Sequence, residues 1–193
     1  NGRTDSAITA LTEMALRGNR SKWRAPALDL LGDIHLITGN DELAKEVFFK
    51  LASENKGKEE GALALYKMAT LHVIRKEYAT AQKALNSVLG GGLASAAFND
   101  AIDLSYTLDI GQREDIAGLD AYSAGLRHEV SRTPDAAVSA YLEDAATGAL
   151  LERRYKRGIE ILLDGQEFDR AEQWALKLVQ KETALTPWAH WII

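Results

Sequence analysis

Hydrophobic positions recur at helical spacing along nearly the whole chain, and they recur in groups of similar length. Five short segments lead through polar residues into an alanine, and a second core-type residue follows four positions later. The five pairs are Ala7 with Leu11, Ala44 with Phe48, Ala81 with Leu85, Ala117 with Ala121, and Ala171 with Ala175. Because residues four apart lie on one face of a helix, each pair predicts a buried helix face.

The spacing of these alanines indicates an internal repeat. Successive alanines are separated by 37, 37, 36 and 54 residues. Upstream residues repeat as well, since Leu28, Leu31, Gly32 and His35 are followed 37 residues later by Leu65, Met68, Ala69 and His72. A fixed period of this length is typical of stacked helical hairpins. No segment of useful length alternates with the period of a strand, so the sequence predicts an all-α fold.

The two best-matched units resemble the tetratricopeptide repeat (TPR) family. The motif is Leu28-x2-Leu31-Gly32-x2-His35, followed by Gly39 and Ala44-x3-Phe48, with Leu and His where the family has Trp and Tyr. The repeat departs from the family in its length of 36 or 37 residues instead of 34, and it lacks the closing proline. The resemblance implies a right-handed α-solenoid of antiparallel helical hairpins.

The repeat predicts one helical domain over residues 1–193. Its expected elements are the second helix of a preceding repeat at 4–17, hairpins at about 25–55, 62–89, 93–131 and 148–181, an extra helix at about 134–147, and the start of a further repeat at 186–193. Thr133 and Pro134 predict the start of the extra helix. Either this helix breaks near Gly148, which we favour, or it continues to Asp164. The run Gly90-Gly91-Gly92 predicts a joint between hairpins.

Composition narrows the classes of function. A net charge of -5 repels phosphate backbones, which argues against a nucleic-acid partner. No apolar run approaches the ~20 residues that span a bilayer, so no membrane insertion is expected. With no cysteines, disulfides and thiolate metal sites are excluded, while cytoplasm and periplasm both remain open as locations. The non-methionine start and a final helix of about two turns suggest a piece of a longer chain.

Candidate catalytic chemistry is sparse. His35 and His72 occupy equivalent repeat positions, where packing explains them better than metal binding. No metal-binding spacing occurs, and the triple glycine lacks the Gly-Lys-Ser/Thr of a phosphate loop. We therefore expect no enzyme activity and no cofactor. The dense basic run at 153–157 fits either solvated side chains around a buried Tyr155 or a site for an acidic peptide or phosphate.

The resemblance to the TPR family also implies a binding face, because the first helix of each hairpin there lines a concave groove that holds a peptide. The matching positions here are Asp29, Asp33, Leu36, Tyr66, Thr70, Val73, Ile102, Tyr106, Asp109, Lys156, Glu160 and Leu163. The acidic Asp29 and Asp33 argue against capture of an acidic chaperone tail. Tyr66 and Tyr106 are either partner-binding anchors or core residues.

Two classes of function follow. The first is a non-enzymatic scaffold that binds a protein or peptide in the groove. The alternative is a regulatory or substrate-recognition module of a larger enzyme or of a bacterial cell-envelope export or assembly machine. Its partners would then include other domains of the same chain, or further copies of it. A self-contained hydrolase is a third hypothesis, for which no acid and base pair stands out.

Overall fold

The computed structural model describes residues 2–17, 21–91, 96–142 and 148–193. Within these residues the prediction of an all-α fold is confirmed, because 81% of them are helical and no strand is present among them. The helices are α1 (Gly2–Leu16), α2 (Arg24–Ile37), α3 (Asp41–Glu54), α4 (Glu59–Ile74), α5 (Tyr78–Leu89), α6 (Ala97–Glu114), α7 (Ile116–Val130), α8 (Pro134–Leu142), α9 (Leu151–Asp164), α10 (Phe168–Val179) and α11 (Thr186–Ile192).

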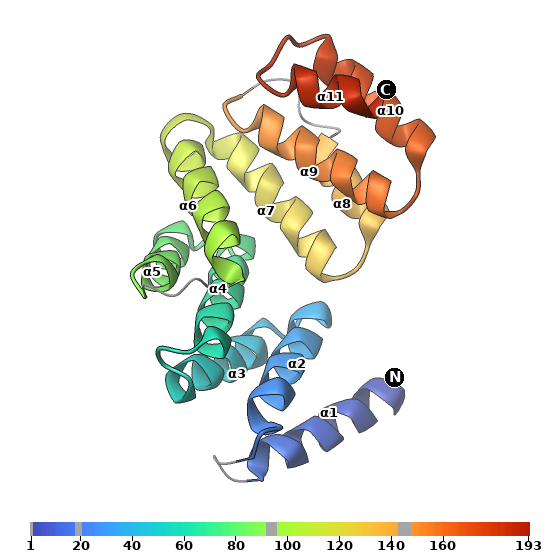
Figure 1. The fold of residues 1–193 in the computed structure, drawn as a ribbon. Helices are drawn as coiled ribbons and strands as arrows, with labels where there is room; N and C mark the ends of the chain where they lie inside the picture. Colours follow the sequence, from blue (N-terminus) through green and yellow to red (C-terminus); the bar gives the residue numbers. More distant parts are fainter. Residues whose placement is uncertain (1, 18–20, 92–95, 143–147) are drawn as a thin grey trace. The chain divides into compact units, whose positions relative to one another are not determined.

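The chain divides into two compact units, and the division falls inside α6. The first unit covers Asn1–Ser105 and the second covers Tyr106–Ile193. In the first unit, neighbours in the series α1 to α5 pack against each other. In the second unit, neighbours in the series α7 to α11 do so (Figure 1). None of the described helices is long and apolar enough to cross a bilayer.

Four helix pairs are joined by the same turn. In each turn the sixth residue donates its backbone N–H to the carbonyl of the first, over 2.8 Å from Asn40 to His35, 2.8 Å from Glu77 to His72, 2.9 Å from Thr133 to His128, and 2.8 Å from Glu167 to Leu162. The fifth residue has positive φ in all four turns, at Gly39, Lys76, Arg132 and Gln166. This arrangement is the Schellman motif, which satisfies the last carbonyls of a helix. It joins α2 to α3, α4 to α5, α7 to α8, and α9 to α10.

Side chains at fixed distances from these turns form the core. Five residues after each positive-φ residue stands a fully buried alanine, namely Ala44, Ala81, Ala137 or Ala171. Two further buried residues stand seven positions before and nine positions after each positive-φ residue. They are Gly32 and Phe48, Ala69 and Leu85, Gly125 and Tyr141, and Ile159 and Ala175. A Cβ atom on Gly32 would lie 2.3 Å from the Phe48 ring, and one on Gly125 would lie 2.4 Å from the Tyr141 ring. Glycine therefore permits the close approach of the two helices.

This register differs from the expected one after residue 89. Ala117 is exposed, and the buried residues of the first turns of α7 are Gly118 and Leu119. Moreover, α8 is joined to α7 by the repeated turn, so it is the second helix of a hairpin and not an addition to the array. The positive-φ residues are spaced by 37, 56 and 34 residues, so the added helix is α6, which lies between two series of hairpins.

The segment before α9 contains a break in the helix. Gly148 has a φ of 118°, which is outside the helical region, and α9 begins at Leu151. Asp115 fixes this segment, since its carboxylate accepts an N–H from Gly118 at 2.8 Å and another from Leu150 at 3.0 Å. The rest of the expected extra helix, 143–147, lies outside the described residues, as does Gly92 of the triple glycine.

Candidate functional site

The predicted binding face is acidic at α2, and a lysine from α4 partly neutralises it. The Lys67 ammonium lies 2.6 Å from Asp29 Oδ1 and 2.8 Å from Asp33 Oδ1. Two carboxylates one helical turn apart repel each other, so this lysine holds them together. The same ammonium lies 5.6 Å from the centre of the Phe48 ring. The acidic pair therefore belongs to a network that links α2, α3 and α4.

Several predicted binding residues lie in the core of the first unit. Leu36, Thr70 and Val73 are buried, and Tyr66 is half-buried. A buried side chain cannot contact a partner without a rearrangement of its neighbours, so these three residues pack the helices together. Of the predicted residues in this unit, Ile102 on α6 has the most exposed side chain, at 47%.

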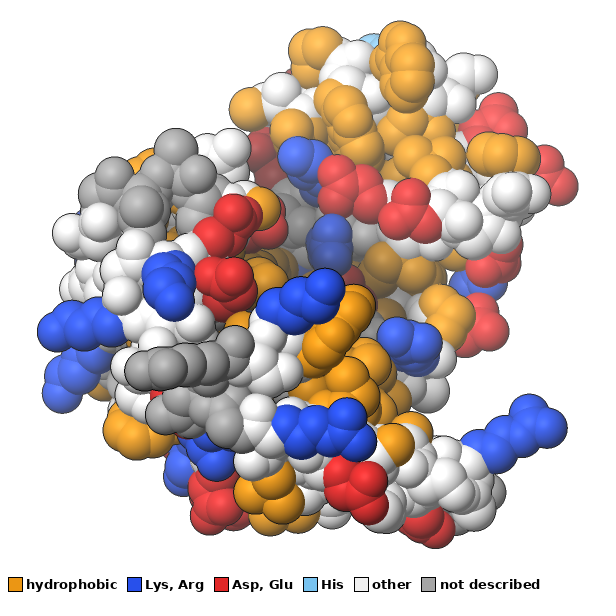
Figure 2. Space-filling model, turned by 60° about the horizontal axis from the view of Figure 1, so that its bottom comes forward, with side chains coloured by type: hydrophobic (Ala, Val, Ile, Leu, Met, Phe, Trp, Pro, Cys, Tyr) orange, Lys and Arg blue, Asp and Glu red, His pale blue; other side chains and the backbone are white. Residues whose placement is uncertain are grey.

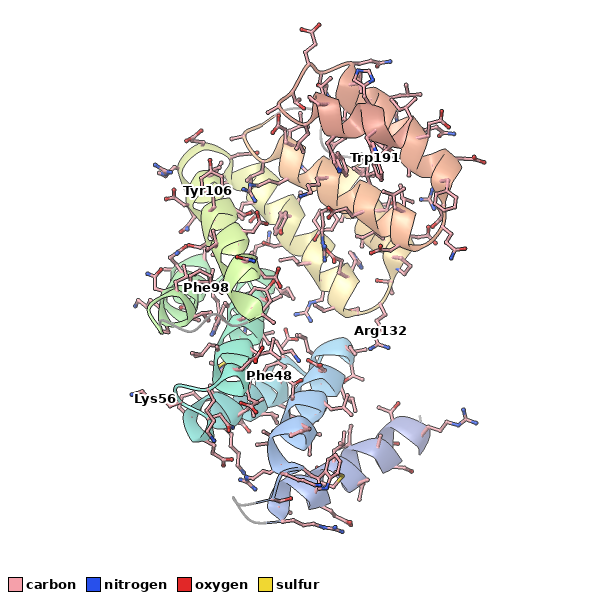
Figure 3. The ribbon with its side chains drawn as sticks, viewed as in Figure 1. Phe48, Lys56, Phe98, Tyr106, Arg132 and Trp191 are labelled. Atoms are coloured by element: carbon pink, nitrogen blue, oxygen red, sulfur yellow. The ribbon has the colours of Figure 1, made fainter. Side chains whose placement is uncertain are left out.

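Tyr106 is the exposed aromatic residue of the predicted face in the second unit. It projects from α6 with 53% of its surface exposed (Figure 3). The Arg153 guanidinium of α9 lies 4.7 Å from the centre of its ring, within the range of a cation–π contact. Arg153 also donates from Nη1 to the buried Thr107 hydroxyl at 3.1 Å. Tyr106 and Arg153 therefore form one surface, held in place from both helices.

The predicted residues on α9 follow Arg153 along the same helix. Lys156 is exposed and lies 3.8 Å from Glu160, which is also 3.8 Å from Arg157. Leu163 is half-buried one turn further on. Asp109 on α6 is exposed and pairs with Arg113. The charged residues of the predicted face are thus in contact with residues of opposite sign.

The basic run at 153–157 divides between two environments. Arg154 is buried and donates to the Ala140 carbonyl at 3.2 Å. Arg157 pairs with Glu129 of α7 through Nε at 2.9 Å and Nη2 at 2.5 Å. Arg154 is therefore part of the packing of the second unit, whereas Arg153 is half-buried and Lys156 and Arg157 are exposed.

A buried polar network stabilises the hairpin of α7 and α8. The Tyr141 hydroxyl donates to Glu129 Oε1 at 2.5 Å, and the Tyr122 ring packs edge-on against Tyr141 at 5.5 Å. Burial raises the pKa of Tyr141 well above its ordinary value, and the nearby Glu129 carboxylate acts in the same direction. The hydrogen bond from Arg157 to Glu129 raises the pKa of Arg157. Tyr141 therefore stays protonated and Arg157 stays charged near neutral pH, and the hydrogen bonds of this network join α7, α8 and α9.

Three of the four histidines occupy the same position, as the first residue of the repeated turn. His72 Nδ1 lies 2.6 Å from the Glu77 carboxylate, and His128 Nδ1 lies 3.2 Å from the Thr133 hydroxyl. His35 is buried, and its Nδ1 has no hydrogen-bond partner among the residues that the structure describes. Burial lowers the pKa of His35, because the charged imidazolium would lose its hydration. No group of three or more acidic or histidine residues among the described residues could hold a metal ion.

On the face drawn in Figure 2, basic and acidic side chains stand among hydrophobic ones.

Comparisons with known proteins do not assign the chain to a family. It matches no protein-family model, and no curated protein is similar to it at a significant level. The functional argument therefore depends on the geometry of the molecule itself.

Sequence reasoning missed Lys67, the contact of Arg153 with Tyr106, and the equivalence of α7 with the first helices of the other hairpins. Lys67 and Arg153 each contact a helix distant in sequence, and no local pattern shows such a contact. The α7 register did leave a signal: His128, Ala137 and Tyr141 have the same mutual spacing as His35, Ala44 and Phe48. In this register Tyr122, Leu126 and Glu129 are the equivalents of Tyr66, Thr70 and Val73.

Proposed function

We propose that this chain is a TPR-like, right-handed α-solenoid that binds a polypeptide segment and has no catalytic role. The proposal is supported by one repeated turn that joins four helix pairs, with a buried alanine at the same distance after each turn. Helix pairs that repeat in this way stack into an array, and the array presents successive helices to a partner.

The binding surface includes residues of the predicted face that solvent can reach. In the second unit these are Tyr106, Asp109, Lys156 and Glu160, with Leu163 at the margin, and in the first unit Ile102 is exposed. Exposed tyrosines are frequent anchors of protein interfaces, since they bury a large ring and lose little side-chain entropy. A polypeptide fits this combination of aromatic and charged groups better than nucleic acid does, because the chain has a net charge of -5.

A peptide-display screen against the full chain tests this proposal. Captured peptides should share a pattern, and Tyr106→Ala should weaken their binding about tenfold or more, as expected for an interface anchor. Phe49→Ala is the matched control, because Phe49 is 64% exposed on α3, outside the predicted face. Circular dichroism should show equal helix content in both variants.

Two results would count against the proposal. The first is a failure of the chain to capture any peptide family. The second is capture that Phe49→Ala abolishes and Tyr106→Ala leaves intact.

A further inference from the structure

We propose that α1 and the exposed side of α2 bind an amphipathic helix of a partner protein, which lies beside α1 and α2 as α2 lies beside α3 and α4. This helix carries uncharged residues where α2 carries Asp29 and Asp33. The inference goes beyond the proposed function, because it concerns a surface of the first unit that is separate from the one around Tyr106.

The first unit contains the template for this contact. Helix α3 packs against both α2 and α4, and α2 and α4 also touch each other. The Phe48 ring of α3 fills the space beside Gly32 of α2, and neither Ala44 nor Phe48 has any exposed surface. A second helix of a hairpin is thus covered by its own first helix on one side and by the next first helix on the other.

In α1 the equivalent residues are only partly covered. Ala7 and Leu11 stand 37 positions before Ala44 and Phe48, and both are half-buried. Among the described helices, α2 is the one that packs closely against α1. Of the two neighbours that α3 has, the described residues therefore supply α1 only with the one that follows it.

A second observation, on α2, indicates the same place. The residue nine positions before the positive-φ residue of the turn is Lys67 on α4 and Arg157 on α9. Lys67 contacts the acidic pair of α2, and Arg157 contacts Glu129 of α7. In both units this position faces the first helix of the preceding hairpin. Its equivalent on α2 is Leu30, which is 50% exposed.

Leu30 belongs to an apolar stripe on α2. Trp23 lies about two turns before it on the same side and is 56% exposed, and Ile34 follows one turn after it. Ile34 is half-buried, whereas Leu71, its equivalent on α4, is fully buried. The stripe is therefore less covered than the same side of the next first helix.

The apolar stripe borders α1, so one helix can cover both. Ala27 lies about two turns before Ile34 on the same side of α2, and it belongs to one core cluster with Ala15 of α1. A helix that covers the partly exposed face of α1 therefore also lies beside Leu30. This is the arrangement that α2 has with α3 and α4.

Leu30 determines which residues the partner helix presents. In the template, two carboxylates of α2 face the ammonium of Lys67. Opposite Leu30 a carboxylate would lose hydration without gaining a hydrogen bond, so that contact is unfavourable. Uncharged residues at the positions of Asp29 and Asp33 avoid this loss. Burial of Leu30 and Trp23 then favours binding, because it removes apolar surface from water.

Two synthetic peptides test this inference on the full chain. The first has the sequence of α4, residues 59–74, in which Tyr66 and Thr70 stand at the positions of the acidic pair. The second carries aspartate at both positions. With fluorescein labels, fluorescence anisotropy should show about tenfold or more tighter binding of the first peptide, because the second brings two charges against Leu30.

The variant Leu30→Lys should reverse this preference. The new lysine stands where Lys67 stands on α4, so it can pair with both aspartates of the second peptide. Leu43→Lys is the matched control, because Leu43 on α3 is 47% exposed and lies outside the surface. The control should keep the wild-type preference, and circular dichroism should show equal helix content in both variants.

Substitutions on α1 locate the bound peptides. Ala7→Trp fills the partly covered face and should weaken the binding of both peptides about tenfold or more, since the added ring occupies the space of the partner helix. Ala10→Trp is the control, because Ala10 is on the exposed side of α1. Tyr106→Ala should also leave both affinities unchanged.

Three outcomes would overturn the inference. The first is that neither peptide binds, and the second is a preference that Leu30→Lys leaves unchanged or that Leu43→Lys changes equally. The third is self-association of the chain, measured by analytical ultracentrifugation, that Ala7→Trp abolishes and Ala10→Trp preserves, because a second copy would then occupy the surface. The proposed function is unaffected by all three, since the display screen with Tyr106→Ala tests it separately.

Discussion

At the scale of single residues, equivalent buried positions of the four hairpins combine a small residue with a large one. The small residue is on the first helix in three hairpins and on the second in the fourth, as Gly32 with Phe48, Ala69 with Leu85, Gly125 with Tyr141, and Ile159 with Ala175. The two glycines lie directly against the aromatic rings. Protein cores are packed to nearly crystalline density, so the two volumes must change together.

Replacement of Gly32 by alanine tests this compensation. The new Cβ would lie 2.3 Å from a Phe48 ring carbon, so Gly32→Ala should lower the free energy of unfolding by roughly 1–3 kcal/mol. The added change Phe48→Leu creates the combination that Ala69 and Leu85 use, and it should recover part of the loss. Urea denaturation of both variants measures this coupling, and additive losses in the double variant would argue against it.

A second residue-scale prediction concerns acid sensitivity. Burial depresses the pKa of His35 below its ordinary 6.5 in the folded chain, so the unfolded chain binds a proton more readily. The stability that neutral His35 contributes is complete above pH 6.5, and it declines as the pH falls from there towards the folded pKa. The variant His35→Leu should therefore lose less stability than the wild type between pH 7.5 and 5.5, measured by urea denaturation. Equal losses would show that His35 is not the acid-sensitive group.

At the scale of elements, the sixth residue of the repeated turn determines the hydrogen bonding of the histidine at the first position. Glu77 accepts from His72, and this bond lowers the pKa of Glu77. In the turn between α2 and α3, by contrast, the Asn40 side chain donates to Thr38 at 2.9 Å, and within the described parts of the chain His35 Nδ1 has no hydrogen-bond partner. The same backbone motif thus carries two different polar arrangements.

An exchange of this side chain should weaken the pH response of the turn. With Asn40→Glu, a carboxylate can reach His35 as Glu77 reaches His72, and it should raise the pKa of His35 from its depressed value. The loss of stability between pH 7.5 and 5.5 should then be smaller than in the wild type. Asn40→Gln is the control of equal size. If the NMR titration of His35 is the same in both variants, the carboxylate does not reach the ring.

Asp115 has two roles at the junction of elements. Its carboxylate caps α7 through Gly118, and it binds the Leu150 N–H before α9. Asp115→Ala should cost roughly 2 kcal/mol, from the lost cap and the unsatisfied backbone donor together. Asp115→Ser keeps a capping oxygen but is too short for Leu150, so it should cost about half as much. Amide exchange at Leu150 should accelerate equally in both, and slow exchange in either variant would refute the second role.

The sequence predicts elements well where local patterns determine them. The helical segments and the turns at Gly39, Lys76 and Gln166 follow from periodicity and from alanines at fixed spacing. The register of α7 was wrong, because Gln112 to Ala117 imitates the segments before the other alanines while its alanine is exposed. The buried state of Leu36, Thr70 and Val73 depends on helices distant in sequence, and periodicity on one helix cannot show which neighbours cover it.

At the scale of the whole molecule, α6 interrupts the alternation of hairpin helices. The repeated turn makes α2 and α4 first helices in one unit, and it makes α7 and α9 first helices in the other. The division between the two units falls inside α6. Along the sequence, the two series of first helices are thus separated by a helix of a different kind.

NMR spectroscopy on the labelled full chain tests the repeated hairpin most directly. Nuclear Overhauser effects should connect Gly125 to the Tyr141 ring as they connect Gly32 to the Phe48 ring, and scalar couplings should show positive φ at Lys76, Arg132 and Gln166. The methyl group of Ala117 should be exposed to solvent. A buried Ala117, together with no contact between Gly125 and Tyr141, would contradict the account.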